Sequence, residues 1–545
     1  MLARRRFPIR RLLSYRTTRP AADVAARRHG RRKRRPIRAG CGVIARTPVW
    51  GWLVTCVLCV LLRAPSWATD LDAALGAINA SDVRVHIDAL ADAPLEGREA
   101  GTRGGRAAVA YLVKQFESQQ LSPAGDSGGY VQAFRGSCSN ILGVLAGSDP
   151  ELRHEYVLVG AHFDHVGYGS ALNSRGPIGR VHHGADDNAS GVAGVLELQD
   201  ACQTLPHSPR RSILFALWDG EEKGMWGSRH WLAHPTVPLD KIVLVFNLDM
   251  IGRLQHDTVH VYGSRTSWGL RRLLSERNRA TNLSLDFSWD MKPNSDHYAF
   301  FDKEIPILML HTGLHADFHR PSDSADKIDH EGAERVTRLA FAALFDVANA
   351  DKVAGFRDRS RQENAAGRAR LERPLPDRAL RLGVAWRKGV LETGGVLLTH
   401  ITPNSPAARA GLRTGDRLLR FADYEVRDER QLQRRVLAAS SPAAVLVERG
   451  DRDRVEVTVR LAGSPLRLEI SWRDDDAEPG TVVVSQVVPG SAPRAAGLLP
   501  GDRIYQVQGR DFADGGQLSQ WLQTQGGRVE LLFERRGRLG SVVLQ

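Results

Sequence analysis

Five residues of the types that bind metal ions recur through the middle of the chain, each shortly after an apolar run. They are His162 in AHFDH, Asp187 in GADDNASG, Glu222 in WDGEEKG, Asp249 in FNLDMIG and His319 in DFHRPSD. Two imidazoles and three carboxylates are enough ligands for two zinc ions that share one bridging carboxylate. Such a set predicts hydrolysis by a water molecule that the metal activates.

Two further carboxylates lie beside these ligands. Glu221 directly precedes Glu222, so one can bind metal while the other reaches the attacking water and moves its proton. His162 and Asp164 alternate at the end of an apolar run and share one face of a strand. We expect Asp164 to accept the second N–H of the His162 ring and so to orient it. An isolated pair of this kind is more often a surface pair.

The ligand at position 319 has competitors. His311 and His315 are close enough in sequence to take its place, whereas the other nearby histidines are expected to line the pocket or the surface. A Gly-rich turn around Asp187 suits a bridging carboxylate, because it lets the backbone approach two cations closely.

The elements that must position these residues alternate between strands and helices. Apolar runs at 156–163, 212–219, 241–249, 258–263 and 305–310 predict strands, and 81–121, 190–205 and 269–280 have helical spacing. Continuous apolar strands that alternate with helices predict an α/β fold, a mixed sheet with helices on both faces. Sites in such sheets form beyond the carboxyl ends of the strands, where these residues fall.

Composition and charge bound the class of protein. A chain of 545 residues with 42% apolar and 25% charged residues predicts a globular protein of two to four domains. Residues 1–47 hold sixteen Lys or Arg and one acid and carry +15, against +13 for the whole chain. The remainder is at −2 and lacks the basic surface of a nucleic-acid-binding protein.

The N-terminal region predicts export to the periplasm or the medium. The fifteen residues PVWGWLVTCVLCVLL (48–62) are short for a membrane span and suit a signal peptide, and Ser66-Trp67-Ala68 fits a cleavage site before Thr69. The alternatives are an uncleaved membrane anchor or a start site further along the chain. Twin-Arg export is only weakly indicated.

Cys138 and Cys202 are the cysteines beyond this leader, and one disulfide or two buried thiols are both compatible with them.

The C-terminal part of the chain repeats itself. Residues 351–378 are rich in charge and predict a linker. Beyond it SPAARAGLRTGDRLL (405–419) matches SAPRAAGLLPGDRIY (491–505), a period of 86 residues. The predicted domains are therefore a leader (1–68), an α/β domain (69–350), the linker (351–378), and two small, mostly β repeats (379–462 and 463–545).

The motifs of the α/β region resemble the co-catalytic di-zinc aminopeptidase family, whose relatives include glutamate carboxypeptidases and glutaminyl cyclases. They include LEGREAGTRGG, NILGVLAG, AHFDH, GADDNASGVAG, WDGEEKGMWGS, LDMIG, SDHYAF and HRPSDSADKID, in the family's order over about 80–350. The resemblance implies that His162, Asp187 and Asp249 hold one Zn²⁺, and that Asp187, Glu222 and His319 hold the other. It also implies that Glu221 is the base and that the Asp187–Asn188 peptide bond is cis.

The repeats resemble PDZ domains attached to exported proteases. In the first repeat Leu382, Gly383 and Val384 fit the loop that holds a peptide's C-terminal carboxylate, while the peptide itself adds a strand to the sheet edge. In the second repeat Glu469 replaces the glycine and should repel a carboxylate. We therefore expect peptide or protein C-termini to bind the first repeat better. A purely structural role for the second repeat is equally compatible with its sequence.

The expected function is that of an exported, zinc-dependent exopeptidase, an aminopeptidase that removes N-terminal residues from peptides. The alternatives are a non-catalytic peptide-binding protein on the same fold, which would have lost ligands, and a relative with cyclase or carboxypeptidase activity. The GDSGG run (125–129) matches the nucleophile loop of chymotrypsin-like proteases, but no matching histidine loop accompanies it.

Overall fold

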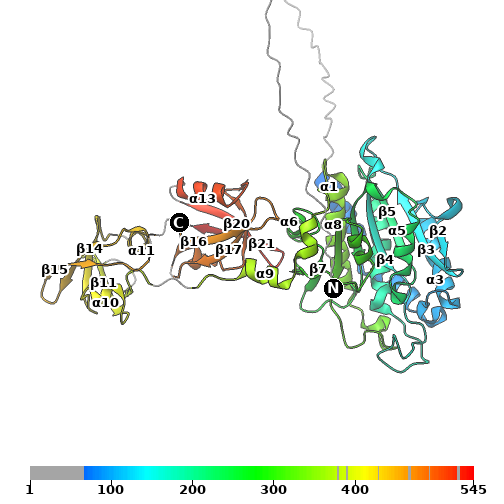
Figure 1. Cartoon of the computed structure of the whole chain (residues 1–545), viewed down its shortest axis with the longest axis horizontal. Coiled ribbons are helices and arrows are strands. Elements are labelled where there is room, and N and C mark those ends of the chain that lie inside the picture. The colour runs from blue at the N-terminus through cyan, green and yellow to red at the C-terminus, as the bar shows by residue number, and fades with distance from the viewer. Residues whose placement is uncertain are drawn as a thin grey trace, which may run out of the picture. The chain divides into compact units, whose positions relative to one another are not determined.

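The computed structural model describes residues 67–544, apart from short gaps at 377–379, 388, 390, 428, 464, 466–467, 490 and 525–527. The predicted leader therefore lies outside the described residues, except for Trp67 and Ala68, which begin the first helix. Three sheets are seen in the described part: one of nine strands, which defines the nine-stranded domain (67–350), and one of six in each repeat (Figure 1).

The nine-stranded sheet is mixed. Its strands run in the order β1-β3-β5-β4-β6-β9-β7-β8, with β2 paired to β3. The strands are β1 (Ser122–Pro123), β2 (Val131–Phe134), β3 (Cys138–Leu145), β4 (Tyr156–His162), β5 (Ser212–Trp218), β6 (Ile242–Leu248), β7 (Thr258–Tyr262), β8 (Ser284–Phe287) and β9 (Ile307–His311). The helices are α1 (Trp67–Ala77), α2 (Ala80–Leu90), α3 (Arg103–Ser118), α4 (Gly191–Gln203), α5 (Trp226–Ala233), α6 (Leu270–Arg277), α7 (His297–Asp302) and α8 (His330–Asn349).

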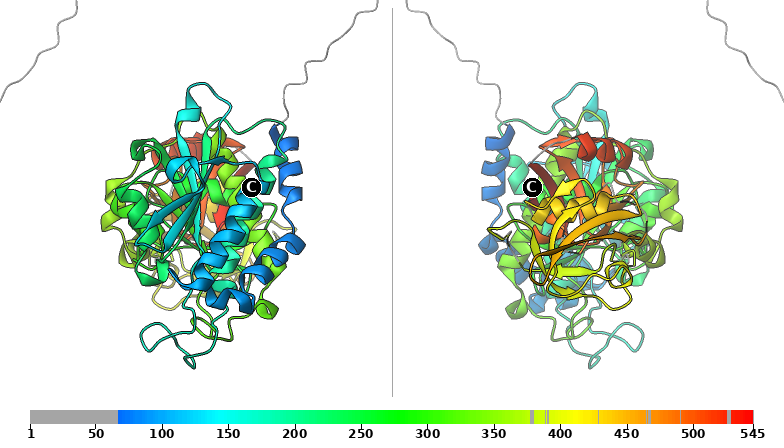
Figure 2. Two further views of the ribbon diagram at one scale, coloured as in Figure 1. Left: turned by 90° about the vertical axis from the view of Figure 1, so that its right-hand side faces the viewer. Right: turned by 90° about the vertical axis from the view of Figure 1, so that its left-hand side faces the viewer.

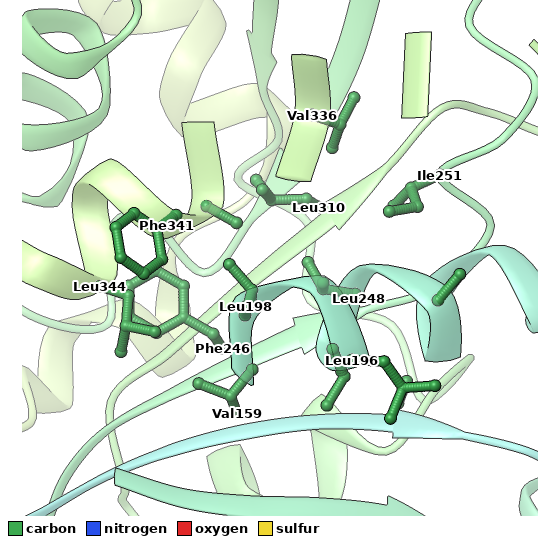
Figure 3. Packing of buried hydrophobic residues seen from close by; sticks show 14 of the residues in the cluster. Val159, Leu196, Leu198, Phe246, Leu248, Ile251, Leu310, Val336, Phe341 and Leu344 are labelled. Atoms are coloured by element: carbon green, nitrogen blue, oxygen red, sulfur yellow. The ribbon is translucent and has the colours of Figure 1, made fainter. Parts of the chain in front are cut away.

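Helices cover both faces of this sheet (Figure 2). Alternate residues of β4 belong to different cores, because successive side chains of a strand point to opposite faces. Val157 and Val159 pack in the larger core with α4 and α8, and Leu158 packs in the other with α5 and α7. Figure 3 shows the larger core, where side chains of α4, α8 and the strands meet, among them Leu196, Leu198, Phe341, Leu344, Val159 and Phe246.

The central strands bring the metal-ligand-type residues to one edge. β5, β4 and β6 are parallel neighbours, and His162 stands beside Trp218 in the register. β4 ends at His162, β5 is followed by the turn with Glu221 and Glu222, and β6 is followed by Asp249. The predicted α/β fold class is confirmed, including the mixed sheet with helices on both faces.

The two repeats have the same topology. The first contains β10 (Val384–Trp386), β11 (Val396–Ile401), α10 (Pro406–Arg409), β12 (Arg417–Phe421), β13 (Tyr424–Glu425), α11 (Glu429–Ala438), β14 (Ala443–Arg449) and β15 (Asp453–Val459). The second contains β16 (Ile470–Asp474), β17 (Val482–Val487), α12 (Ala492–Ala495), β18 (Arg503–Val507), β19 (Arg510–Asp511), α13 (Gly515–Thr524), β20 (Val529–Arg535) and β21 (Arg538–Leu544). The strand orders β10-β11-β12-β14-β15 and β16-β17-β18-β20-β21 correspond one to one.

The second repeat is joined to the nine-stranded domain by buried ion pairs and hydrogen bonds. Both oxygens of the Glu534 carboxylate accept hydrogen bonds from the Arg271 guanidinium, at 2.9 and 3.0 Å. The Glu478 carboxylate accepts the backbone N–H groups of Arg271 and Arg272, and so caps the N-terminus of α6. The side chains of Arg271, Glu478 and Glu534 are buried.

The charged segment predicted as a linker also makes such contacts. It contains a short 3-10 helix (Asp358–Gln362) and α9 (Ala365–Glu372). Glu363 binds the guanidinium groups of Arg265 and Arg357 at 2.7–2.8 Å, and Arg265 also binds Asp475 of the second repeat. Its charges therefore contribute to ion pairs within the fold.

Two predictions about membranes and cysteines fall partly within this structure. Among the described residues, no helix is both long and apolar enough to cross a bilayer. The apolar run at 48–62 is not among them. Cys138 and Cys202 are two free, buried thiols, which settles the alternative left open by the sequence.

Candidate metal centre and active site

The first cluster joins the ends of β4 and β6 to the turn before α4. Nε2 of His162 lies 3.5 Å from an oxygen of Asp187 and 3.5 Å from an oxygen of Asp249. The three side chains are buried, and one donor atom of each lies within 4.8 Å of the other two. A single ion among them would have the one nitrogen and two oxygens that zinc accepts.

The second cluster shares Asp187. Nε2 of His319 lies 3.2 Å from the second oxygen of Asp187 and 3.2 Å from an oxygen of Glu222. Nδ1 of His165 lies 3.0 Å from the other Glu222 oxygen and 3.6 Å from Asp187. Asp187 therefore presents one oxygen to each cluster, which is the arrangement a bridging ligand requires.

The turn that carries Asp187 is fixed by a carboxylate from far along the chain. Asp323 accepts the backbone N–H of Asp186 and of Asp187 at 3.1–3.2 Å, and it is fully buried. Gly184, with φ of +58°, begins this turn, and a Cβ there would lie 2.5 Å from the His165 ring. The Asp187–Asn188 peptide bond is cis, as the resemblance implied.

Glu221 and Glu222 are held by Asp164. The Asp164 carboxylate accepts the backbone N–H of Glu221 at 2.9 Å and that of Glu222 at 3.3 Å. Nδ1 of His162 lies 3.2 Å from the Asp164 backbone oxygen and 3.7 Å from its carboxylate. Asp164 thus orients the imidazole through its main chain, and its side chain fixes the neighbouring glutamate turn, a role that the sequence did not predict.

A buried arginine, Arg98, connects two segments of the site. The Arg98 guanidinium donates to the backbone oxygens of Phe163, Leu90, His183 and Gly184. Burial lowers its pKa to about 10, although the nearby carboxylates of the site oppose that shift. Arg98 therefore ties the segment after β4 to the turn that begins at Gly184.

The electrostatics of the two clusters favour a bound cation. Burial lowers the pKa of His319, but Asp187 and Glu222 outweigh it and raise that pKa to about 11. Oδ2 of Asp187, which faces the second cluster, is buried and accepts no hydrogen bond. Burial also raises the pKa of Glu221 well above its usual range. An excess of buried carboxylate around imidazoles is the donor set that divalent zinc fits.

A cavity of about 610 Å³ opens onto both clusters. It is lined by His162, Asp187, Glu221, Glu222, Asp249 and His319, and on its other walls by Arg175, Met250, His260, Tyr262, Lys292, Asn294, His311, Gly313, Leu314 and Phe318. A peptide end of a few residues fits a cavity of this volume.

The structure thus brings together all five predicted ligands and Glu221. The competing histidines point elsewhere: His315 lies 3.1 Å from Asp186, and Nδ1 of His311 accepts the Gly313 N–H. The sequence alone did not single out Asp323, Arg98 or the contact of His165 with Glu222. Asp323 and Arg98 lie inside quoted motifs, but no local pattern indicates what a buried side chain contacts.

The PDZ-like loops differ as their sequences do. Leu382 is buried in the core of the first repeat, and Gly383 has φ of +80° with Ser405 so close that a Cβ would lie 2.2 Å from the serine Cβ. Val384 begins β10, an edge strand. At the equivalent place in the second repeat, burial raises the pKa of Glu469, and its carboxylate accepts the backbone N–H of Ala492.

An α/β sheet with paired imidazole and carboxylate clusters beyond its parallel strands defines the class of zinc-dependent exopeptidases. Residues 140–344 match the sequence model of Peptidase family M28, and residues 483–535 match that of the PDZ domain. The chain is thus similar to Peptidase family M28 over its α/β region and to the PDZ domain near its C-terminus, which confirms the resemblance predicted from the motifs.

Its relatives are similar over part of their length. The aminopeptidase YwaD of Bacillus subtilis (strain 168) is 25% identical over 255 residues, which are 44% of this chain and 51% of that protein. A probable leucine aminopeptidase 1 of Trichophyton verrucosum is 32% identical over 161 residues, 28% of this chain and 40% of its own. The solved LapA aminopeptidase of Legionella pneumophila has a TM-score of 0.43 at 20% identity, covering 52% of this chain and 74% of that one. The chain spans about half the length of the first curated relatives that it matches.

Proposed function

We propose that the protein is a zinc-dependent aminopeptidase with two Zn²⁺ ions per chain. The observation that carries the proposal is the position of Asp187, which offers one oxygen to His162 and the other to His319. His162 and Asp249 would complete one site, and Glu222 and His319 the other. Zinc bound there would polarise the scissile carbonyl. It would also lower the pKa of a water molecule, so that hydroxide is available as the nucleophile near neutral pH.

Glu221 is the proton carrier in this proposal. Glu221 is half-buried, lines the same cavity as the ligands, and makes no hydrogen bond to any of them in the described structure. Its backbone is fixed by Asp164, so the carboxylate is held next to the clusters. Glu221 would take a proton from the attacking water and deliver it to the amine that leaves.

The proposal is tested by Glu221→Gln. Gln keeps the size of the side chain and cannot accept a proton, so zinc content by mass spectrometry should stay near wild type. Turnover of aminoacyl and dipeptide substrates should fall by about 10²- to 10⁴-fold. Glu117→Gln, at an exposed position of α3, is the matched control and should keep full activity.

Three outcomes would contradict it. Equal turnover by Glu221→Gln would overturn the role of that residue, and activity that resists a chelator would overturn the metal assignment. Cleavage of N-acetylated peptides at the same rate as free ones would indicate a carboxypeptidase type of specificity.

We further propose that the protein is exported, and that its first repeat binds peptide C-termini. Export rests on the basic run and the apolar residues 48–62. N-terminal sequencing of the protein from the periplasm or medium tests whether the chain begins near Thr69 or keeps residues 48–62 as an anchor.

Peptide binding rests on the open edge of β10 next to Gly383. The second repeat should bind more weakly, because the Glu469 carboxylate stands where the first repeat has Gly383 and would repel the carboxylate of a peptide.

A further inference from the structure

A second group of metal-ligand-type residues lies outside the active site, between α2, α3 and α4. It consists of His86 on α2 and of Glu197 and Asp200 on α4. One donor atom of each lies within 4.8 Å of the other two. Glu197 and Asp200 are three residues apart on a helix, so both side chains project from the same face.

Glu197 is the most buried member of the group. Its side chain is about 1% exposed. One carboxylate oxygen accepts the backbone N–H of Asn79 at 3.2 Å, and the other, Oε1, is buried and accepts no hydrogen bond. A buried carboxylate oxygen without a partner is unfavourable by about 1–3 kcal/mol or more, so it indicates a missing positive or donating group.

The other two members, His86 and Asp200, each have one further atom that could bind a cation. Nδ1 of His86 lies 2.8 Å from the Tyr111 hydroxyl, which leaves Nε2 available. A hydrogen bond from the ring's other nitrogen is the usual way in which a metal-bound imidazole is oriented. One oxygen of Asp200 accepts a hydrogen bond from the Gln119 amide, and the second is available.

The local charge is negative. Burial, with contributions from the carboxylates of Asp200, Asp82 and Glu334, raises the pKa of Glu197 to about 8. Burial likewise raises the pKa of Asp200, and it lowers that of His86, which keeps the imidazole neutral. A neutral imidazole and two carboxylates that lack a counter-charge are the forms in which these side chains bind metal.

We propose that His86, Glu197 and Asp200 bind a divalent transition-metal ion of the zinc or manganese class. Ligand atoms around one such ion are about 3–3.5 Å apart, so the half-buried His86 and Asp200 side chains must close slightly around it. The imidazole disfavours calcium and magnesium, which prefer oxygen ligands. The ion would join the N-terminal helix α2 to α4 and would take no part in catalysis.

Metal stoichiometry tests this site. Protein stripped with a chelator is reloaded with Zn²⁺ or with Mn²⁺ and desalted, and metal per chain is measured by mass spectrometry. Glu197→Gln should hold one equivalent less than wild type and keep its peptidase turnover. Glu334→Gln is the matched control, because Glu334 accepts the neighbouring N–H of Ala80 without belonging to the group, and it should lose none.

Asp249→Asn separates this proposal from the proposed function. That variant should lose metal from the active site and still lose one further equivalent when combined with Glu197→Gln. If Glu197→Gln does not fold, Asp200→Asn, at a half-buried position, should show the same loss. Metal should also raise the melting temperature of Asp249→Asn by about 5 °C and leave that of the double variant unchanged. Equal metal content with and without the Glu197 carboxylate would overturn the site.

Discussion

Neighbouring carboxylates in this site make different contacts, and these contacts determine which carboxylate stabilises the fold and which faces the imidazoles. One Asp186 oxygen accepts the Ser190 hydroxyl and the Gly252 N–H, and the other faces His315. The Asp187 carboxylate faces imidazoles on both sides. The Asp186 carboxylate is thus occupied by contacts within the fold, whereas the Asp187 carboxylate is free for the proposed role of cation ligand. The same division separates Glu222, which faces His319, from Glu221.

Asp323 provides a test at this scale. Asp323→Asn removes the negative charge that holds two backbone N–H groups of the Asp187 turn, and an amide can accept with only one oxygen. We expect zinc affinity, measured by competition with a chromophoric chelator, to fall about 10- to 100-fold. Asp326→Asn, an exposed neighbour in the same motif, should leave that affinity unchanged. Unaltered affinity in Asp323→Asn would show that the turn holds its own shape.

The sequence predicted the elements better than their arrangement. The five apolar runs became β4, β5, β6, β7 and β9, because a doubly covered strand must be apolar throughout. The antiparallel strands β1 to β3 were not predicted, since their short, half-polar pattern resembles loops. Strand order was also out of reach, because periodicity reports which face is buried and not which strand lies alongside.

The ligands of the site could be predicted from the sequence, but the residues that position them could not. Residue types and their places after strands indicated the ligands, because the ends of parallel strands meet at one edge. The pairing of ligands with individual ions came from the resemblance. The roles of Arg98 and Asp323 depend on contacts over more than 60 residues of chain, which no local pattern encodes.

Gly383 provides a test at the scale of the element. Gly383→Ala places a Cβ 2.2 Å from that of Ser405 and forces the loop before β10 to move. Binding of a labelled peptide with a free C-terminal carboxylate, measured by fluorescence anisotropy, should weaken at least about 10-fold. Gly450→Ala has the same sign of φ and open space around the Cβ, so it should bind as wild type does. An amidated peptide that binds equally well would contradict carboxylate recognition.

At the scale of the whole molecule, the two repeats differ in how they are attached. The second repeat supplies Asp475, Glu478 and Glu534 to arginines and a helix end of the nine-stranded domain. The sequence predicted only a linker before the repeats, because a run of charged residues has the same pattern whether it faces water or pairs with distant acids. The partner acids of Arg265 lie about 100 and 210 residues further along the chain.

Breaking one buried pair tests this attachment. Glu534→Ala leaves the Arg271 guanidinium buried without its partner, and we expect it to lower the free energy of unfolding by about 3–5 kcal/mol in urea. The double variant Arg271→Met, Glu534→Met should recover most of that loss. Glu456→Ala removes an exposed pair with Arg420, and it should change stability by less than about 1 kcal/mol. Equal effects of the two single variants would contradict a buried attachment.

The attachment should also depend on pH. Burial, with a contribution from Asp475, raises the pKa of Glu478 from 4.5 to about 7. The folded protein thus holds this proton more tightly than the unfolded chain, and the stabilisation is complete below about pH 4.5 and lost as pH rises to 7. The change is at most about 3 kcal/mol. Urea unfolding between pH 5 and 8 should therefore show a shallower decline for Glu478→Gln than for wild type.

The contacts of Glu478 and its neighbours also determine where the polypeptide can be truncated. A polypeptide that stops after residue 350 would contain the whole nine-stranded domain, yet it would expose Arg265 and Arg271 without their acids and leave the first turn of α6 uncapped. Such a fragment should express poorly, adhere to anionic resins and precipitate at low salt. Removal of the first repeat alone, with residues 351–376 spliced to the second, should instead yield a well-behaved protein.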